Sequence, residues 1–307
     1  LILIVLHSAL YAHVFFFAPF VLSYLAWFFY SRRWPERGCM PSNFVRSNSF
    51  HWQWAGDYFN HRIVKTAELP ADRNYIVGAH PHGLLCIGMT GSFASDMFGI
   101  REQYKGLKTW SVTLGGHFLL PLRRESLMWA GMGATSKQNL QLILRQKEKG
   151  QAVTIAIGGC NEGIMSAPGT HRLKLADRKG FVKVAMAEGA DLVPMFHFGE
   201  NDTYRPVHGI CPKRLRNAQA HIVKNFGFCP PSLVGESMIG LPWGGLVPIR
   251  THLETVIGEA IHVEKNTNPS QEEVDKMHTA YCEKLIELFE THKANYGVPP
   301  EQRIILY

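Results

Sequence analysis

The first thirty residues contain no Asp, Glu, Lys or Arg, and Arg32, Arg33 and Arg37 follow directly. An uncharged segment of this length is typical of a membrane-embedded element rather than of a buried core helix. Two full spans would need about 40 residues, and Pro19 would kink a helix at its centre. We therefore predict that residues 1–30 form either a re-entrant hairpin or one membrane helix. The basic flank predicts that the following domain faces the cytosol.

Paired cysteines and metal-binding motifs are also missing. The six cysteines lie at positions 39, 86, 160, 211, 229 and 282 without paired spacing, which indicates free thiols in a reducing compartment. No His-Glu-x-x-His or Cys-x-x-Cys pattern is present, so we predict no metal site. The basic residues are spread out and no nucleic-acid motif appears, which argues against a nucleic-acid partner.

The chain does contain enough apolar material for a sizeable core. It has 307 residues, of which 46% are hydrophobic, and its net charge of +7 suits a partner with phosphates or an anionic membrane. Strand and helix patterns alternate from Tyr75 onward, which predicts an α/β domain with a mixed sheet. With no internal repeat, we predict a membrane-embedded segment at 1–30, an interfacial amphipathic or linker region at 31–70, and one α/β domain at 71–307.

Apolar runs and helix caps place the expected elements. Strands are expected at 75–77, 109–114, 152–157, 192–198 with a break at Pro194, and 255–257. Helices are expected at 44–59, 135–149 with Thr135 as N-cap, 178–188, and 270–296 with a capping box of Ser270 and Glu273. The helix at 44–59 is amphipathic and rich in Trp and Tyr, which fits either a membrane surface or packing on the domain.

Two histidines flank a proline at the end of the strand at 75–77, in the sequence His80-Pro81-His82-Gly83. Pro81 restricts its own φ and favours an extended His80, so the loop presents an imidazole rigidly. A neutral imidazole, with a pKa of about 6.5, is suited to act as a general base. The alternative is a hydrogen-bonded structural histidine. No His-Glu-x-x-His or Cys-x-x-Cys pattern supplies further ligands, so we do not expect His80 and His82 to share a metal.

Two further clusters carry polar groups. Gly158-Gly159-Cys160-Asn161-Glu162-Gly163 follows the strand at 152–157, and its glycine pair would let backbone N–H groups face an oxyanion or a phosphate. Glu162 is a candidate to accept a hydrogen bond from the base histidine; a solvated loop carboxylate is the alternative. Five basic residues then fall within 12 positions, and they fit either phosphate binding or a solvated helix face. They are Arg172, Lys174, Arg178, Lys179 and Lys183.

Several of these motifs occur together in one order. The set is His80-Pro81-His82-Gly83, Pro121 with Arg124-Glu125, Gly158-Gly159 with Glu162, Arg178-Lys179-Gly180-Phe181, and Phe198-Gly199-Glu200-Asn201. Over essentially the whole chain it resembles the type-2 diacylglycerol acyltransferase family, which includes monoacylglycerol acyltransferases and wax-ester synthases. The family core is similar to glycerolipid acyltransferases that use a His and an Asp four residues apart. Here those positions hold Leu84 and Cys86, so the resemblance assigns the role of the acid to Glu162.

The resemblance implies transfer of an acyl group from acyl-coenzyme A to a mono- or diacylglycerol, at the endoplasmic reticulum membrane and lipid droplets. Acyl-coenzyme A is then a co-substrate, with no permanently bound cofactor. We assign His82 as the base, with Glu162 and His80 as further catalytic residues. The coenzyme is expected to contact Gly158, Gly159, Asn161 and the five basic residues. A long-chain alcohol acceptor and a homo-oligomer stay open, and the chain departs from the family pattern at Asn161 and at 233–237.

Three other functions fit parts of the sequence. A lipid hydrolase would need Gly-x-Ser-x-Gly, and the nearest stretch, Gly235-Glu236-Ser237-Met238-Ile239, lacks the final glycine. A double displacement would use the thiolate of Cys86 or Cys160 beside a histidine. A non-catalytic membrane protein would bind acyl-coenzyme A without turnover. The combined motifs favour acyl transfer over all three.

Overall fold

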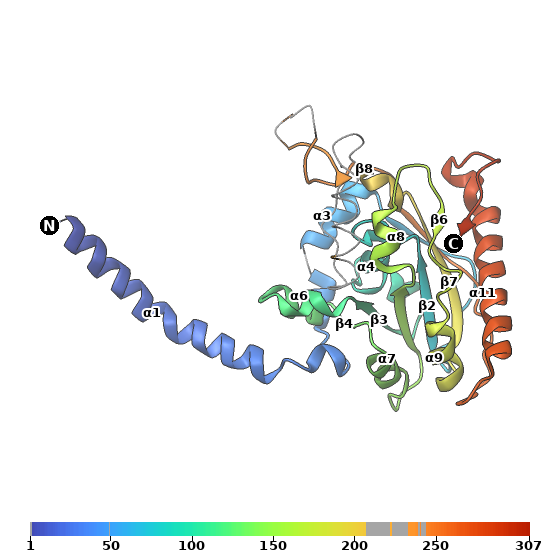
Figure 1. Ribbon diagram of the computed structural model, residues 1–307, viewed down its shortest axis with the longest axis horizontal. Helices are drawn as coiled ribbons and strands as arrows, with labels where there is room; N and C mark the ends of the chain where they lie inside the picture. The colour runs from blue at the N-terminus through green and yellow to red at the C-terminus, as the bar shows by residue number, and fades with distance from the viewer. Residues whose placement is uncertain (1, 49, 207–221, 223–232, 239, 241–243) are drawn as a thin grey trace.

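A long N-terminal helix extends from an α/β body in the computed structural model of the chain (Figure 1). The structure describes residues 2–48, 50–206, 222, 233–238, 240 and 244–307, so Cys211 and Cys229 lie outside the described residues. Helix α1 (Ile2–Tyr30) is continuous and contains Pro19, so the hairpin is not formed. Within the described part of the chain, no helix has both the length and the apolar character needed to cross a membrane.

Seven strands form the central sheet, in the order β1-β10-β7-β2-β5-β3-β4. Their bounds are β1 (Arg62–Lys65), β2 (Tyr75–His80), β3 (Lys108–Thr113), β4 (Met132–Ala134), β5 (Gln151–Ala156), β7 (Asp191–Phe198) and β10 (Glu254–Ile257). The five strands from β7 to β4 are parallel, whereas β10 runs antiparallel to β7 and β1 pairs in parallel with β10. The predicted mixed sheet is therefore confirmed. Because β1 lies inside 31–70, the sheet begins ahead of residue 71.

The central strands are buried on both faces, as the apolar runs predict. Every residue of β2 and β7 is buried. Ile76 belongs to one apolar cluster, with Val153, Phe181 and Tyr281. Its neighbour Val77 packs into a second cluster on the opposite face of the sheet. Strand β7 is not broken at Pro194, since a proline removes only its own N–H donor and the strand pairs in register on both sides.

Helices cover both faces of the sheet (Figure 1). They are α4 (Ile87–Phe93), α5 (Ile100–Gln103), α6 (Arg123–Trp129), α7 (Lys137–Leu144), α8 (Gly159–Ile164), α9 (Gly180–Glu188) and α11 (Gln271–His292), with 3-10 turns η1 (Trp34–Glu36), η2 (Gly115–Leu119), η3 (Glu200–Thr203) and η4 (Lys293–Tyr296). Two small sheets pair β6 (Arg172–Leu173) with β11 (Ile305–Leu306), and β8 (Arg205–Pro206) with β9 (Leu233–Val234).

The predicted helix caps are only partly right. The capping box of Ser270 and Glu273 at the start of α11 is confirmed, because both of its reciprocal hydrogen bonds form. The predicted cap of α7 is wrong: Ser136, one residue after Thr135, accepts the hydrogen bond from the N–H of Asn139. That helix also ends at Leu144, ahead of the predicted Lys149.

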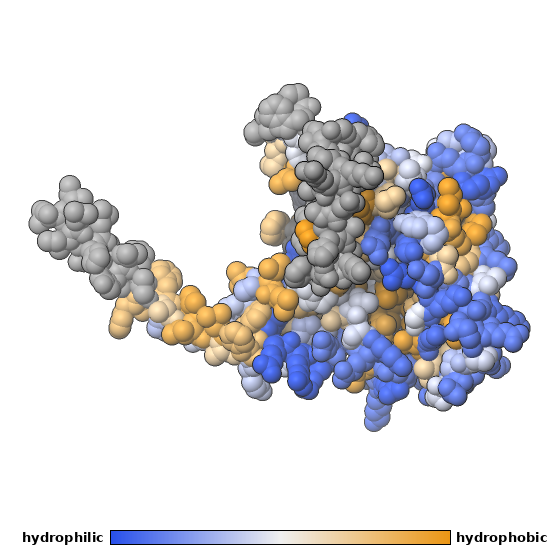
Figure 2. All heavy atoms as spheres, in the orientation of Figure 1, coloured by the Kyte–Doolittle hydropathy of each residue, from blue (hydrophilic) through white to orange (hydrophobic). Residues whose placement is uncertain are grey.

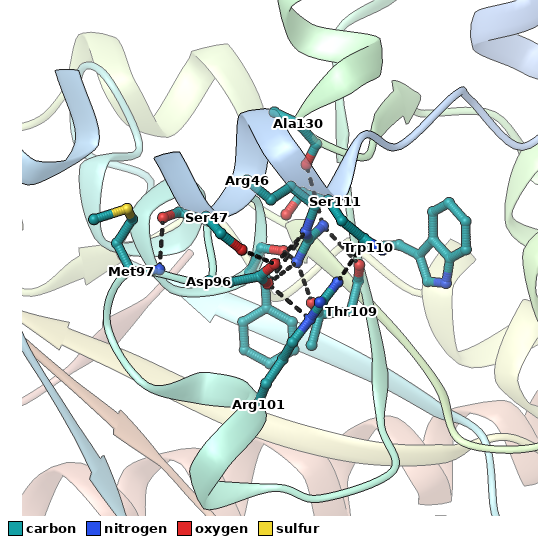
Figure 3. Close-up of polar contacts among 12 residues, drawn as sticks. Arg46, Ser47, Asp96, Met97, Arg101, Thr109, Trp110, Ser111 and Ala130 are labelled. Atoms are coloured by element: carbon teal, nitrogen blue, oxygen red, sulfur yellow. Dashed lines mark hydrogen bonds and ion pairs between the residues drawn. The ribbon is translucent and has the colours of Figure 1, made fainter. Parts of the chain in front are cut away.

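The segment predicted as a helix over 44–59 is helical in both of its described parts, α2 (Asn43–Asn48) and α3 (Phe50–Phe59), and residue 49 lies outside the described residues. Arg46 of α2 is almost completely buried, and Figure 3 shows its guanidinium inside a ring of acceptors. It pairs with the carboxylate of Asp96 at 2.8 Å and donates to the main-chain carbonyls of Phe93, Thr109 and Ala130. This network fixes α2 to the body beside β3 and α6.

A second buried arginine holds the end of α1. Arg124 donates to the carbonyl of Phe28 at 2.6 Å and to the hydroxyl of Ser31, and its guanidinium lies 4.5 Å from the Phe28 ring centre. The neighbouring Glu125 accepts a hydrogen bond from the Tyr24 hydroxyl at 2.7 Å. A cation is favourable at a helix C-terminus, where carbonyls lack partners. The Arg124-Glu125 motif therefore joins α1 to α6.

Candidate active site

Three loops meet at the carboxyl edge of the central strands. Strands β7, β2 and β5 are adjacent and parallel, so the residues that follow them, His82, Glu162 and Glu200, emerge at one edge. The loops are in close contact. A side chain at Gly83 would overlap Glu200, and one at Gly163 would lie 3.1 Å from Nδ1 of His82.

The His82 imidazole has a defined tautomer. Its Nδ1 lies 2.8 Å from the carbonyl oxygen of Gly83, and because a carbonyl only accepts, Nδ1 must carry the proton. The basic lone pair is then on Nε2. Burial lowers the pKa of His82 from its ordinary value of 6.5, so the ring is neutral near pH 7. His82 thus presents an unprotonated nitrogen at a partly exposed position.

Glu162 is buried and close to His82, but it does not bind the imidazole as predicted. One carboxylate oxygen accepts the backbone N–H of His82 at 2.5 Å, and the other accepts the backbone N–H of Lys174 at 2.8 Å. The expected hydrogen bond is wrong because the Gly83 carbonyl already occupies Nδ1. Burial raises the pKa of Glu162 to about 7, against the lowering effect of the two N–H groups and of Arg178. The carboxylate therefore joins the histidine loop to the basic segment.

His80 is a hydrogen-bonded structural histidine, which was the alternative to a catalytic role. It is fully buried, and its Nε2 lies 3.0 Å from the hydroxyl of Tyr281 on α11. Burial lowers its pKa to about 3. The predicted catalytic role of His80 does not fit this position, because a side chain inside the core does not meet a substrate.

The two glycines after β5 differ in their surroundings. A side chain at Gly158 would overlap the carboxylate of Glu162, so a glycine is needed there for close packing. Gly159 has a φ of +63°, and a Cβ added there would meet no atom within 4 Å. Asn161 is exposed. Of the predicted coenzyme contacts in this loop, Gly159 and Asn161 border open space, whereas Gly158 packs against Glu162.

The five basic residues divide into two groups. Lys179 pairs with Asp275 at 2.8 Å and Lys183 lies 3.4 Å from the Gln271 amide oxygen, so both lie against α11. Arg172 and Lys174 lie over the ring of Tyr307, at 5.3 and 5.4 Å. Arg178 is close enough to Glu162 to lower its pKa. The structure therefore brings three of the five cations to the side of Glu162.

Comparison with known proteins agrees with these motifs. The family model described as diacylglycerol acyltransferase matches residues 10–307. The chain belongs to the diacylglycerol acyltransferase family. The resemblance predicted from the motifs is confirmed.

Individual curated relatives support the same family assignment. It is 39% identical over 281 residues to human 2-acylglycerol O-acyltransferase 3, covering 92% of this chain and 82% of that protein. It is 36% identical over 276 residues to human diacylglycerol O-acyltransferase 2, covering 90% and 71%. A solved structure, the 1-acyl-sn-glycerophosphate acyltransferase PlsC from Thermotoga maritima, matches with a TM-score of 0.43 and 14% identity, over 78% of this chain and 76% of that one.

Glu200 is a second buried carboxylate at this sheet edge. The sequence indicated it only as part of the motif Phe198-Gly199-Glu200-Asn201. Its carboxylate accepts the backbone N–H groups of Ile87 at 3.0 Å and Gly88 at 2.7 Å, in the first turn of α4. Burial raises its pKa to about 7. The available signal was an acidic residue two positions after a largely apolar strand. Glu162 and Glu200 together hold the histidine loop from two sides.

The thiol of Cys86 lies beneath the same loop. Its Sγ is 3.0 Å from the carbonyl oxygen of His82, and burial raises its pKa well above the ordinary value. A protonated thiol is a poor nucleophile, which disfavours a double displacement through Cys86. The four described cysteines, Cys39, Cys86, Cys160 and Cys282, are free thiols, as predicted for them.

Proposed function

We propose that this chain transfers the acyl group of acyl-coenzyme A to the hydroxyl of a mono- or diacylglycerol, with His82 as the general base. The observation that carries the proposal is the tautomer of His82, whose Nδ1 proton is held by the Gly83 carbonyl while Nε2 remains basic. The names of the relatives, which are acylglycerol O-acyltransferases, support this class of acceptor.

The proposed reaction moves one proton out and back. Nε2 of His82 accepts the hydroxyl proton as the acceptor oxygen attacks the thioester carbonyl carbon. The tetrahedral intermediate then expels the thiolate of coenzyme A, which takes the proton from the imidazolium. In its ionised form Glu162 favours the transient imidazolium by its charge, and it also fixes the main chain of His82. The first N–H groups of α4 are occupied by Glu200, so we assign the oxyanion to the N–H of Gly159, the first residue of α8.

The phosphates of coenzyme A are assigned to Arg172, Lys174 and Arg178. These cations lie on the side of Glu162, whereas Lys179 and Lys183 lie against α11. A hydrogen bond to a charged group contributes about 1.5–3 kcal/mol, which is roughly tenfold or more in affinity.

Replacing both Lys174 and Arg178 with Ala is therefore expected to raise the KM for acyl-coenzyme A by at least about tenfold with little change in the acceptor KM. Steady-state kinetics with each substrate varied in turn measures this. Lys183→Ala is the control, since Lys183 contacts α11 and should leave both constants near wild type. Equal effects of the double variant and the control would remove the phosphate assignment.

We also propose that the apolar surface contacts a phospholipid membrane, at the endoplasmic reticulum and lipid droplets, with the catalytic domain on the cytosolic side. Large exposed apolar side chains lie along α1, and others lie on α2, on α3 and on the η2–α6 connection. Figure 2 shows hydrophobic residues along the coloured part of α1 and where it meets the body, while the side around α11 is mostly hydrophilic. Exposed patches of this extent are typical of interaction surfaces.

One assay tests the proposed reaction. Purified protein in mixed micelles receives labelled oleoyl-coenzyme A together with monoacylglycerol, diacylglycerol and a long-chain alcohol in competition. We expect label in di- or triacylglycerol. Label in wax ester would identify the alcohol as the acceptor, release of free fatty acid alone would indicate a hydrolase, and binding without any product would indicate a non-catalytic protein.

A further inference from the structure

The loop after β3 reaches the same sheet edge as the histidine loop and has no role in the reaction described so far. Strand β3 pairs in parallel with β5, and β5 pairs with β2, so the three strands end side by side. After Thr113 the chain continues as Leu114-Gly115-Gly116-His117, in which η2 begins at Gly115. The loop is therefore placed next to Glu162 and close to His82.

Open space lies over the two glycines of this loop. A Cβ added at Gly115 or Gly116 would meet no atom within 4 Å. Neither residue has a positive φ, so their backbone does not require glycine. The absence of side chains here leaves room at the sheet edge without serving the fold of the loop itself.

His117 connects this space to the base. It is half-buried, and burial, the Arg123 guanidinium and the His82 imidazole all lower its pKa. His117 and His82 follow strands β3 and β2, which flank β5 and end at the same sheet edge, and His117 is neutral near pH 7. A neutral imidazole offers one donor and one acceptor, which suits the hydroxyl and ester groups of a glyceride.

The surface beyond His117 is largely apolar, and the exposed Arg123 is the cation on it that acts on His117. Leu119 is 74% exposed and Leu122 is 72% exposed, and the backbone N–H of Leu122 donates to Tyr24 of α1. The cations assigned to the donor lie on a different loop, beyond Glu162. An acylglycerol has no charge, so an apolar surface favours its binding and the cations do not. The phosphates of the donor, in contrast, need the cations.

We propose that Gly115, Gly116 and His117 form the acceptor subsite, which places the reacting hydroxyl of an acylglycerol against His82. The acyl chains of the acceptor leave over Leu119 and Leu122 toward α1, and His117 binds the glycerol backbone. This inference rests on the proposed function and adds the residues that bind and select the acceptor.

The test uses Gly116→Leu, which fills the open space, and His117→Asn, which removes the imidazole. For both we expect the acceptor KM to rise about tenfold, with the KM for acyl-coenzyme A within twofold of wild type. Gly116→Leu should reduce turnover of diacylglycerol more than that of monoacylglycerol, because the second acyl chain needs more room. Gly180→Leu is the matched control, since Gly180 also faces open space but lies at the start of α9.

Direct binding separates this inference from the proposed reaction. Dioleoylglycerol in mixed micelles, without any acyl-coenzyme A, is titrated against each protein and followed by tryptophan fluorescence, with thermal unfolding as the check of folding. Weaker binding by the two variants and unchanged binding by Gly180→Leu supports the subsite even if wild type shows no turnover. Unchanged binding and acceptor KM in folded variants, or a rise confined to the KM for acyl-coenzyme A, would overturn it.

Discussion

His82→Ala is expected to lower kcat for acyl transfer by about 10²- to 10⁴-fold, the range that a positioned general base contributes. The variant removes Nε2, which is the basic atom because the Nδ1 proton is held by Gly83. Fold stability should change little, since His82 is partly exposed and its backbone N–H, which holds Glu162, remains. Turnover of labelled oleoyl-coenzyme A by purified protein measures the loss.

The pH dependence gives the same variant a second readout. The base is active when unprotonated, and burial lowers the pKa of His82 below its ordinary 6.5. Wild-type kcat/KM should therefore rise with pH, level off before neutrality, and fall as acid protonates the ring. The residual activity of His82→Ala should lack this step.

His262→Ala is the matched control for this experiment. His262 is 64% exposed and lies beside Asp191 at the amino end of β7, at the opposite edge of the sheet from His82. Its loss should leave kcat near wild type. Full turnover by His82→Ala, or an equal loss in both variants, would refute the role of His82 as the base.

Arg46→Ala is expected to lower the free energy of unfolding by about 3–5 kcal/mol, because it leaves a buried carboxylate without its main partner. The Arg46 side chain is 1% exposed, and that of Asp96 is 6% exposed. The carbonyls of Phe93, Thr109 and Ala130 lose a donor at the same time. Equilibrium urea unfolding in detergent, followed by tryptophan fluorescence, measures the change.

Two other variants show whether burial and geometry are responsible. Arg101 pairs with the same carboxylate at 3.0 Å but is 43% exposed, so Arg101→Ala should cost at most about 1 kcal/mol. Arg46→Lys keeps the charge but lacks the planar set of donors, so its stability should fall between wild type and Arg46→Ala. Equal stability of the Arg46 and Arg101 variants would show that this network does not fix α2 to the body.

Local sequence signals account for the elements that were predicted well. The apolar runs at β2, β5 and β7 are buried on both faces of the sheet or nearly so, and Ser270 with Glu273 forms the expected capping box. Such signals act within a few residues, so they are legible without the fold. The error at α7 is of the same kind: Thr135 and Ser136 are both acceptable caps, and tertiary packing selected Ser136.

The sequence predicted which polar residues lie in the site, but not which groups they bind. The sequence indicated that Glu162 and the histidine loop act together, but the bond runs to the main chain of His82. The basic residues were one cluster in sequence, and α11 takes Lys179 and Lys183 away from Glu162. No sequence pattern indicated that Arg46 is buried, because its acceptors come from distant segments at 93–96, 109 and 130.

By itself, the sequence determined five of the seven strands of the central sheet, the capping box of α11, the histidine at a strand end and the family, since each depends on residues close together in the chain or on motifs in order. Only the tertiary structure decided which nitrogen of His82 is basic, which cations lie near Glu162, and that the loops of His117 and His82 share one sheet edge. The reason is the strand order β2-β5-β3, which places loops from 80, 113 and 157 at one edge. That order follows from pairing between segments that are distant in the sequence, so local sequence patterns do not predict it.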